Sequence, residues 1–276
     1  MTSSPQPHDR QPVPLTVTRR GVAAVLTLHR PERRNALGAA LTADLIDAVQ
    51  RVDADPSVRA VVFAADGPAF CPGLDLHELR AELEDRPLGE GEERIWELGR
   101  AGERLLDTIF RCATPTIAAV DGAAAGNGAG LLSVCDLVIV SRRSRIGYPE
   151  VHNGVQLAQI VVHLVRLVGE RTARRLLLGG EMLSADQARA LGLVTEVVEG
   201  DPLGAALAWA QRLATNSPRA LAATKAALRA IGPPEALLVD DALAPRLTAD
   251  AVAGLAAFFD RTDPPWVPGT GVSGPA

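Results

Sequence analysis

The sequence predicts an α/β protein, because segments patterned like β-strands alternate with segments patterned like helices over the first two thirds of the chain. The strand-like segments are short runs rich in Val, Ile and Ala. The helix-like segments repeat apolar residues at intervals of three and four. From Val155 onward the pattern is mostly helical. The 276 residues suffice for one large domain with a sizeable core.

The first two thirds of the chain carry five strand patterns and three helix patterns. The expected strands lie on either side of Gly21 within 15–30, and at 58–66, 116–122 and 136–141. The expected helices lie at 37–55, where Pro56 ends the first, at 95–113, and from Gly126 to 135. Two segments carry no such pattern: 67–75 is rich in turn formers, and 78–94 is highly charged and expected to be a solvated surface loop.

The last third predicts helices interrupted by one strand at 193–200. The expected helices lie at 156–169, 170–180, 184–192, 203–216, 217–232 and 242–261. Ser184 is the expected N-cap of its helix. We therefore divide the chain into a disordered leader (1–13), a ββα core (14–200), a helical region (201–264) and a flexible tail (265–276).

Composition argues against several classes of protein. The net charge of −5 and the lack of a Lys/Arg-rich block disfavour a nucleic-acid binder. Three widely spaced cysteines with no CxxC disfavour disulfides and zinc, so we expect reduced cysteines and no metal. No apolar run is long enough to span a membrane, and the Pro-rich N-terminus lacks a signal-peptide core. These features predict a cytoplasmic protein.

The stretch GAAAGNGAG, residues 122–130, is the least ordinary feature of the sequence. It is not a dinucleotide fingerprint, because Leu131 stands where the last glycine is required, and it lacks the lysine of a phosphate loop and the serine of a nucleophile elbow. Tight packing explains one or two glycines, but not glycines crowded at a helix start. Small residues there expose unpaired backbone N–H groups to a ligand oxygen, which suits an anion or an oxyanion.

A second segment supplies a matching donor. AFCPGLDLHEL, residues 69–79, places a Pro-Gly turn between a strand and a helix-like run. Two such strand–turn–helix junctions facing each other predict an oxyanion hole made of backbone amides.

Five segments together resemble the crotonase (enoyl-CoA hydratase/isomerase) superfamily, and the resemblance covers Val17 to Pro264. They are RRNALGAAL, AVVFAADGPAFCPGLDLHEL, TIAAVDGAAAGNGAGLLSVCDLVIVS, IGYPEVHNGV and VGERTARRLLLGGEMLSADQARALGLVTEVV. The resemblance implies a spiral of ββα units with a helical C-terminal trimerisation region, and a homotrimer or a dimer of trimers. It also implies an acyl-CoA substrate, with coenzyme A as part of the substrate and no separate cofactor.

The resemblance also assigns roles to individual residues. The backbone N–H groups of Leu74 and Asn127 are the expected oxyanion hole, and Glu150 is the expected acid/base. The family usually has glycine where Asn127 stands, and asparagine tolerates a positive φ better than most residues. Hydratases of the family usually carry a further glutamate, which is Gly130 here. We interpret Gly130 as space for a bulky or branched acyl chain.

The remaining expected site residues fall into two groups. Beside Glu150, the substrate pocket is expected to contain Gly126, Gly130, Tyr148 and His152, with His152 on the same face as Glu150 if that segment is extended. Binding of CoA is expected at Arg33, Arg34, Asn35, Ala36, Leu37 and Arg261. His77 is expected to face solvent near the mouth of the site, and His29 and His163 are interpreted as structural.

A single glutamate leaves the reaction open. It can shuttle one proton for hydration, but it is more naturally suited to double-bond isomerisation, where one carboxylate takes a proton and returns it elsewhere. A non-catalytic acyl-CoA binder, thioester hydrolysis and decarboxylation stay as alternatives, because a fold alone does not choose among them.

Overall fold

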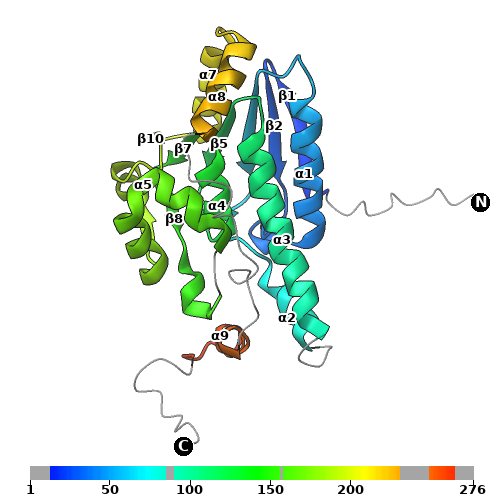
Figure 1. Ribbon diagram of the computed structural model, residues 1–276, viewed down its shortest axis with the longest axis vertical. Helices are drawn as coiled ribbons and strands as arrows, with labels where there is room; N and C mark the ends of the chain where they lie inside the picture. Colours follow the sequence, from blue (N-terminus) through cyan, green and yellow to red (C-terminus); the bar gives the residue numbers. More distant parts are fainter. Residues whose placement is uncertain (1–12, 85–89, 156–157, 231–248, 265–276) are drawn as a thin grey trace, which may run out of the picture.

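The computed structural model describes residues 13–84, 90–155, 158–230 and 249–264 and contains two sheets (Figure 1). The larger sheet has six strands in the order β1-β2-β3-β5-β7-β10, parallel apart from the β1–β2 pair. These strands are Leu15–Arg20 (β1), Ala23–Leu28 (β2), Ala60–Ala65 (β3), Thr116–Val120 (β5), Leu137–Ser141 (β7) and Glu196–Val198 (β10). All six fall within the predicted strand segments.

The smaller sheet was not predicted. Its order is β4-β6-β8-β9, and each of its strands has only three residues. The strands are Ala69–Cys71 (β4), Ala123–Ala125 (β6), Arg145–Gly147 (β8) and Met182–Ser184 (β9). Segments this short, with small residues, carry no strand periodicity of their own, so only their pairing in three dimensions defines them.

The helices follow the strands as expected over most of the described chain. They are Ala39–Asp53 (α1), Leu76–Glu84 (α2), Glu90–Arg111 (α3), Asn127–Val134 (α4), Ala158–Gly179 (α5), Ala185–Ala190 (α6), Pro202–Ala214 (α7), Pro218–Ala230 (α8) and Ala249–Asp260 (α9), with short 3₁₀ helices at Pro31–Arg33 (η1) and Pro149–Asn153 (η2). Among these described helices none is long and apolar enough to cross a membrane.

One predicted segment was wrong, and two predicted helix boundaries are confirmed. The charged segment 78–94 is not a loop, because α2 and α3 cover its described residues. The two helices predicted at 156–169 and 170–180 are confirmed for their described residues, because Ala158–Gly179 (α5) is interrupted at Gly169, whose backbone is not helical (φ 75°, ψ 158°). Ser184 is the N-cap of α6, as predicted, and forms a reciprocal capping box with Gln187. The predictions for 1–12, 231–248 and 265–276 lie outside the described residues.

Successive chain segments confirm the expected spiral of ββα units. In each turn, one strand joins the large sheet, the next short strand joins the small sheet, and a helix follows: β3-β4-α2, β5-β6-α4, then β7-β8 leading through η2 to α5. Each turn therefore returns the chain to the small sheet. The helices that follow β4 and β6 begin side by side there, and this is where the candidate site forms.

Both faces of the large sheet are buried, which explains why its inner strands are apolar without interruption. Alternate residues of β2, such as Ala23 and Val25, face α7, whereas Ala24 and Leu26 face the core shared with α1, α3, α4 and the small sheet. The helix α7 covers the first face, and α1 and α3 lie together over the other (Figure 1). α9 packs separately, with Leu255 against Leu79 of α2.

A buried ion pair attaches α8 to the ends of the large sheet's strands. Lys225, the only lysine in the sequence, is 9% exposed and donates to the Thr114 carbonyl (2.8 Å) and to Asp136 (2.5 Å). Asp136 also accepts the backbone N–H and the hydroxyl of Thr116, which opens β5. One carboxylate thus joins α8, β5 and the residue preceding β7.

Lys225→Met is expected to destabilise the protein by about 1–3 kcal/mol, because Asp136 and the Thr114 carbonyl lose a donor that water cannot fully replace. Urea unfolding of the full chain measures this. The matched control is Arg219→Met, an exposed position on the same helix, which is expected to change stability by less than about 0.5 kcal/mol. Equal stability of the two variants would contradict a structural role for this pair.

Candidate active site

Two strand–turn–helix junctions, β4 to α2 and β6 to α4, meet backbone to backbone. Gly73, with φ of 98°, lies so close that a Cβ atom there would sit 3.0 Å from the amide nitrogen of Asn127. A Cβ atom on Gly128 would overlap the carbonyl oxygen of Cys71. Only glycine allows both approaches, so the crowding of glycines at the start of α4 has a steric cause.

The two predicted oxyanion donors lie at this junction. The Leu74 segment is held by Leu37, whose N–H donates to the Gly73 carbonyl (2.7 Å) and whose carbonyl accepts from Asp75 (3.1 Å). Within the described chain, the amide nitrogens of Leu74 and Asn127 donate to no other residue. Asn127 is the first residue of α4, so its N–H also carries the positive end of the helix dipole. The tolerance of asparagine for a positive φ is not needed at Asn127, since the residue with a positive φ is Gly126, at 53°.

Glu150 lies directly over this junction. It belongs to η2, and its Oε1 is so close to Gly126 that a Cβ atom there would overlap it. Its Oε2 is buried and has no hydrogen-bond partner among the described residues. Burial raises the pKa of Glu150 from 4.5 to about 8, because the charged form loses its water. A carboxylate of raised basicity therefore stands against Gly126, the residue that precedes the Asn127 amide.

An apolar cavity of about 390 Å³ opens next to Glu150. Glu150 is its only charged lining residue in the described chain, and the lining residues are Tyr148, Glu150, Val151, Gly154, Val155, Val161, Leu177 and Leu178. Tyr148 is buried, and its hydroxyl is hydrogen-bonded to Ser133 (2.9 Å), so it presents its ring to the cavity. The cavity suits an apolar group placed beside a proton acceptor.

The space expected at Gly130 is filled. A Cβ atom on Gly130 would lie 2.7 Å from Cδ1 of Ile160 and 3.4 Å from Leu106. Gly130 therefore lets α4 pack closely against α5 and α3 instead of widening the pocket. The hypothesis that Gly130 makes room for a branched acyl chain is wrong for this structure. The apolar side chain of Ile160 occupies the position that a longer residue would need.

His152 does not share a face with Glu150. The segment is a 3₁₀ helix and not extended, and the exposed His152 ring contacts the Gly179 carbonyl through Nε2 (3.2 Å) at the end of α5. His77 is exposed, as predicted, and its ring packs edge-on against Phe259 of α9. His163 is largely buried against Phe110, and burial together with nearby Arg166 lowers its pKa to about 4.

Three of the residues predicted to bind CoA have side chains that are buried in the protein: Asn35, Ala36 and Leu37. Asn35 is fully buried, accepts from the Arg30 amide, and donates to the carbonyls of Asp66 and Ala69. Ala36 and Leu37 are buried as well. The side chain of Asn35 is therefore not available to bind CoA, because its oxygen and its amide nitrogen are already hydrogen-bonded to backbone atoms of the protein.

The basic residues predicted for CoA are exposed. Arg33 and Arg34 lie on the surface beside this turn, and Arg34 has a left-handed backbone, with φ of 53°. Arg261 is exposed just after α9. Their roles stay predictions.

Sequence reasoning missed a buried ion pair that supports the site. Asp75, 2% exposed, pairs with Arg30 (3.2 Å), which also donates to the Ala36 carbonyl. Asp75 follows the predicted oxyanion residue Leu74 directly. Asp75 lies in a turn without a helical or strand periodicity, and Arg30 is 45 residues away in the sequence. The ion pair could therefore not be predicted from the sequence.

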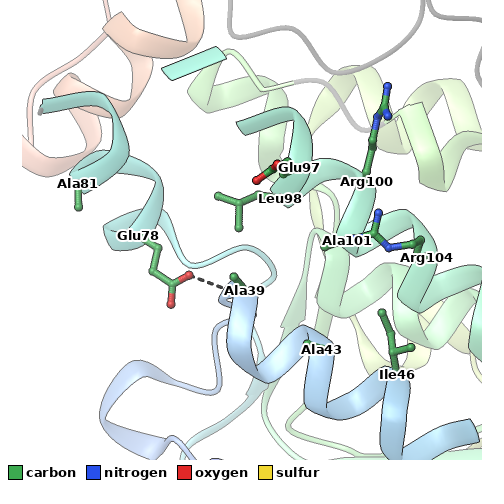
Figure 2. Close-up of a pocket in the computed structure, with 10 residues that line it drawn as sticks. All are labelled: Ala39, Ala43, Ile46, Glu78, Ala81, Glu97, Leu98, Arg100, Ala101 and Arg104. Carbon is green, nitrogen blue, oxygen red and sulfur yellow. Dashed lines mark hydrogen bonds between the residues drawn. The ribbon is translucent and has the colours of Figure 1, made fainter. Parts of the chain in front are cut away.

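A larger cavity of about 580 Å³ lies between α1, α2 and α3 and is separate from Glu150 (Figure 2). At its edge, Glu78 of α2 accepts the N–H of Ala39, the first residue of α1, at 2.9 Å. Because Gly38, the N-cap of α1, has no side chain to cap the helix, Glu78 caps it from a neighbouring element. The contact fixes α2, and with it the Leu74 segment, against α1.

These features define the class of protein. Two sheets wound as a ββα spiral form the crotonase-type fold, and the Glu150 carboxylate lies against a junction whose amides at Leu74 and Asn127 have no acceptor among the described residues, which makes it a candidate oxyanion site. The profile of the enoyl-CoA hydratase/isomerase family matches residues 18–267. The chain therefore belongs to the enoyl-CoA hydratase/isomerase family, within the crotonase superfamily.

Individual relatives agree with this assignment. A Thermus thermophilus protein with the provisional name of enoyl-CoA hydratase is 40% identical over 89% of this chain and 97% of its own length. The 2,3-dehydroadipyl-CoA hydratase of Escherichia coli is 35% identical over 78% of this chain and 81% of its own. The crystal structure of an enoyl-CoA hydratase from Mycobacterium smegmatis is 32% identical, with a TM-score of 0.72 over 92% of this chain and 99% of that one.

Gly128→Ala is expected to destabilise the protein by about 1–3 kcal/mol, because its Cβ would overlap the Cys71 carbonyl, which belongs to the rigid backbone of β4. The control is Gly179→Ala, since a Cβ there meets no atom within 4 Å. Thermal and urea unfolding of both variants measure the difference. If Gly128→Ala is as stable as Gly179→Ala, the two junctions are not in the close contact described.

Glu150 is expected to make stability depend on pH. Its pKa is higher in the folded state than in the unfolded chain, so its contribution is full below about pH 4.5 and is lost as pH rises through about 8. The unfolding free energy of the wild type should therefore fall relative to Glu150→Gln between about pH 5 and about pH 9. Parallel pH dependences of the two proteins would show that the folded state does not raise the pKa of Glu150.

Proposed function

We propose that this protein catalyses proton transfer on enoyl-CoA thioesters, with Glu150 as the acid/base and the N–H groups of Leu74 and Asn127 as donors to the thioester oxygen. The observation that carries the proposal is the carboxylate of Glu150: its buried Oε2 has no partner among the described residues, and its Oε1 packs against Gly126, the residue before Asn127. Family membership supplies the substrate class, an acyl-CoA.

The two parts of the site would work together. A proton next to a thioester carbonyl is too weakly acidic for an ordinary carboxylate, unless the negative charge that develops on the carbonyl oxygen is stabilised. Two preorganised amide donors stabilise that charge, and losing one such donor typically costs about 3–4 kcal/mol of barrier. The apolar surroundings that raise the pKa of Glu150 make its carboxylate a stronger base near neutral pH.

Double-bond isomerisation follows most directly from this arrangement. Glu150 would take a proton from C2 of a 3-enoyl-CoA, the electrons would move to the carbonyl oxygen, and the same carboxyl group would return the proton at C4. No second acid/base group is needed. The packing of Ile160 and Leu106 at Gly130 supports a one-carboxylate reaction, because it closes that position to a further acidic side chain.

Hydration is the second candidate, and the names of the relatives favour it. Glu150 would then remove a proton from water as oxygen adds to C3, and would deliver that proton to C2. In either reaction, we propose that the apolar part of the acyl group occupies the cavity beside Glu150 and that Arg33, Arg34 and Arg261 contact the phosphates of CoA. A homotrimer or dimer of trimers is proposed from the family resemblance.

Glu150→Gln is expected to lower kcat/KM by about 10²–10⁴-fold while acyl-CoA binding persists, because the amide cannot accept the proton. The assay uses the purified full chain with straight and branched 2-enoyl-CoA and 3-enoyl-CoA. Product mass identifies the reaction, since hydration adds a water and isomerisation leaves the mass unchanged. Glu170→Gln, an exposed glutamate on α5, is the matched control and should retain full activity.

Two outcomes would contradict the proposal. If the Glu150→Gln variant keeps wild-type turnover, Glu150 is not the acid/base. If the wild type binds acyl-CoA but transforms none of these substrates, the protein is better described as an acyl-CoA binder or as an enzyme of another chemistry on this fold.

A further inference from the structure

The side chain of Asn127, on α4, lies against residues of α3 and α5. It is 7% exposed, and its Oδ1 accepts a hydrogen bond from Nε2 of Gln159 at 2.9 Å. Gln159 lies in the first turn of α5, and the same helix supplies Val161 and Leu177 to the cavity wall. One hydrogen bond therefore connects the residue at the proposed oxyanion hole to the helix that lines the proposed acyl site.

The other end of the carboxamide rests on α3. A Cβ atom on Gly102 would lie 2.8 Å from Nδ2 of Asn127, which is closer than real Cβ contacts come. Gly102 stands inside the 22-residue helix α3, where glycine lowers helix stability relative to alanine. Its presence there is explained by the space that the Asn127 carboxamide needs.

The start of α4 lacks the usual means of fixing a helix end. Its N-cap is Gly126, which has no side chain to cap the first turn, and it has an unusual backbone with φ of 53° and ψ of −127°. Among the described residues the Asn127 amide has no acceptor, and the nearest backbone bond is donated by Gly126 to the Gly147 carbonyl (3.0 Å). The carboxamide, between Gln159 and Gly102, is the side-chain contact that holds Asn127 itself.

We propose that Asn127 and Gln159 are positioning residues, whose side-chain hydrogen bond sets the Asn127 N–H at the point where the thioester oxygen binds. This inference rests on the proposed oxyanion role of that N–H. The carboxamide does not touch the substrate in this assignment; it acts by holding the backbone. Because Gln159 belongs to α5, the hydrogen bond also links the position of the Asn127 N–H to this helix. The cavity wall formed by α5 and the oxyanion hole therefore keep a fixed relative position.

The kinetic test uses Gln159→Leu, which removes the donor at similar size, and Asn127→Gly, which keeps the backbone N–H and removes the carboxamide. Each is expected to lower kcat about tenfold with KM changed less than about twofold, because a displaced donor weakens transition-state stabilisation more than binding. The double variant should be no worse than the single ones, since both remove one interaction. Gln50→Leu, an exposed glutamine on α1, is the matched control.

A spectroscopic measurement distinguishes a displaced Asn127 N–H from a general loss of structure in the variants. A conjugated 2,4-dienoyl-CoA absorbs at longer wavelength when donors polarise its carbonyl, and it can be bound to proteins that also carry Glu150→Gln, so that turnover does not interfere. The red shift should be smaller with Gln159→Leu and with Gly102→Ala, which crowds the carboxamide from the other side, and unchanged with Gln50→Leu. Gly102→Ala keeps the test valid if one of the other variants folds poorly.

The outcomes distinguish this inference from the proposed function. A red shift in the reference protein that persists in full with Gln159→Leu and Gly102→Ala overturns the positioning role alone. A reference protein that binds the dienoyl-CoA without any red shift overturns the two-amide oxyanion hole, and the positioning role with it. Strictly additive losses in the double variant would likewise show that Asn127 and Gln159 do not act through one hydrogen bond.

Discussion

The close approach of two backbone segments, from Cys71 to Leu74 and from Gly126 to Gly128, is the constraint on which the rest of the structure depends. The carbonyl of Cys71 lies where any side chain on Gly128 would be, and Gly73 lies against the Asn127 amide. A contact this tight brings together the amides of Leu74 and Asn127, which donate to no other residue in the described part of the chain. The pairing of β4 with β6 and of β6 with β8 in the small sheet brings these two junctions together.

Burial of Glu150 has two consequences that come from the same cause. Water is removed from the carboxylate, so its charged form is destabilised and its pKa rises to about 8. That costs folding stability at alkaline pH, and it also makes the group a better proton acceptor if it is the acid/base that we propose. The unpartnered Oε2 fits this interpretation, because an internal hydrogen bond would lower its basicity.

Polar residues around the site divide into those that hold the fold and those left free. Asn35, Asp75 and Arg30 use their polar groups on one another and on nearby backbone, and they keep the Leu74 segment attached to the turn before α1. Arg33 and Arg34, in the same turn, stay exposed. Neighbouring residues of this turn thus differ in role: the buried Asn35 stabilises the fold, whereas Arg33 and Arg34 are exposed to solvent.

The sequence by itself determined the large-sheet strands, most helices and the family, because long apolar periodicities and the two Gly-containing junctions are local signals. It also pointed to Leu74, Asn127 and Glu150, which the fold brings together. Only the tertiary structure decided the three-residue strands, the filling of the Gly130 site by Ile160, the turning away of His152 and the burial of Asn35. Each of these depends on contacts between residues distant in sequence, which no local pattern records.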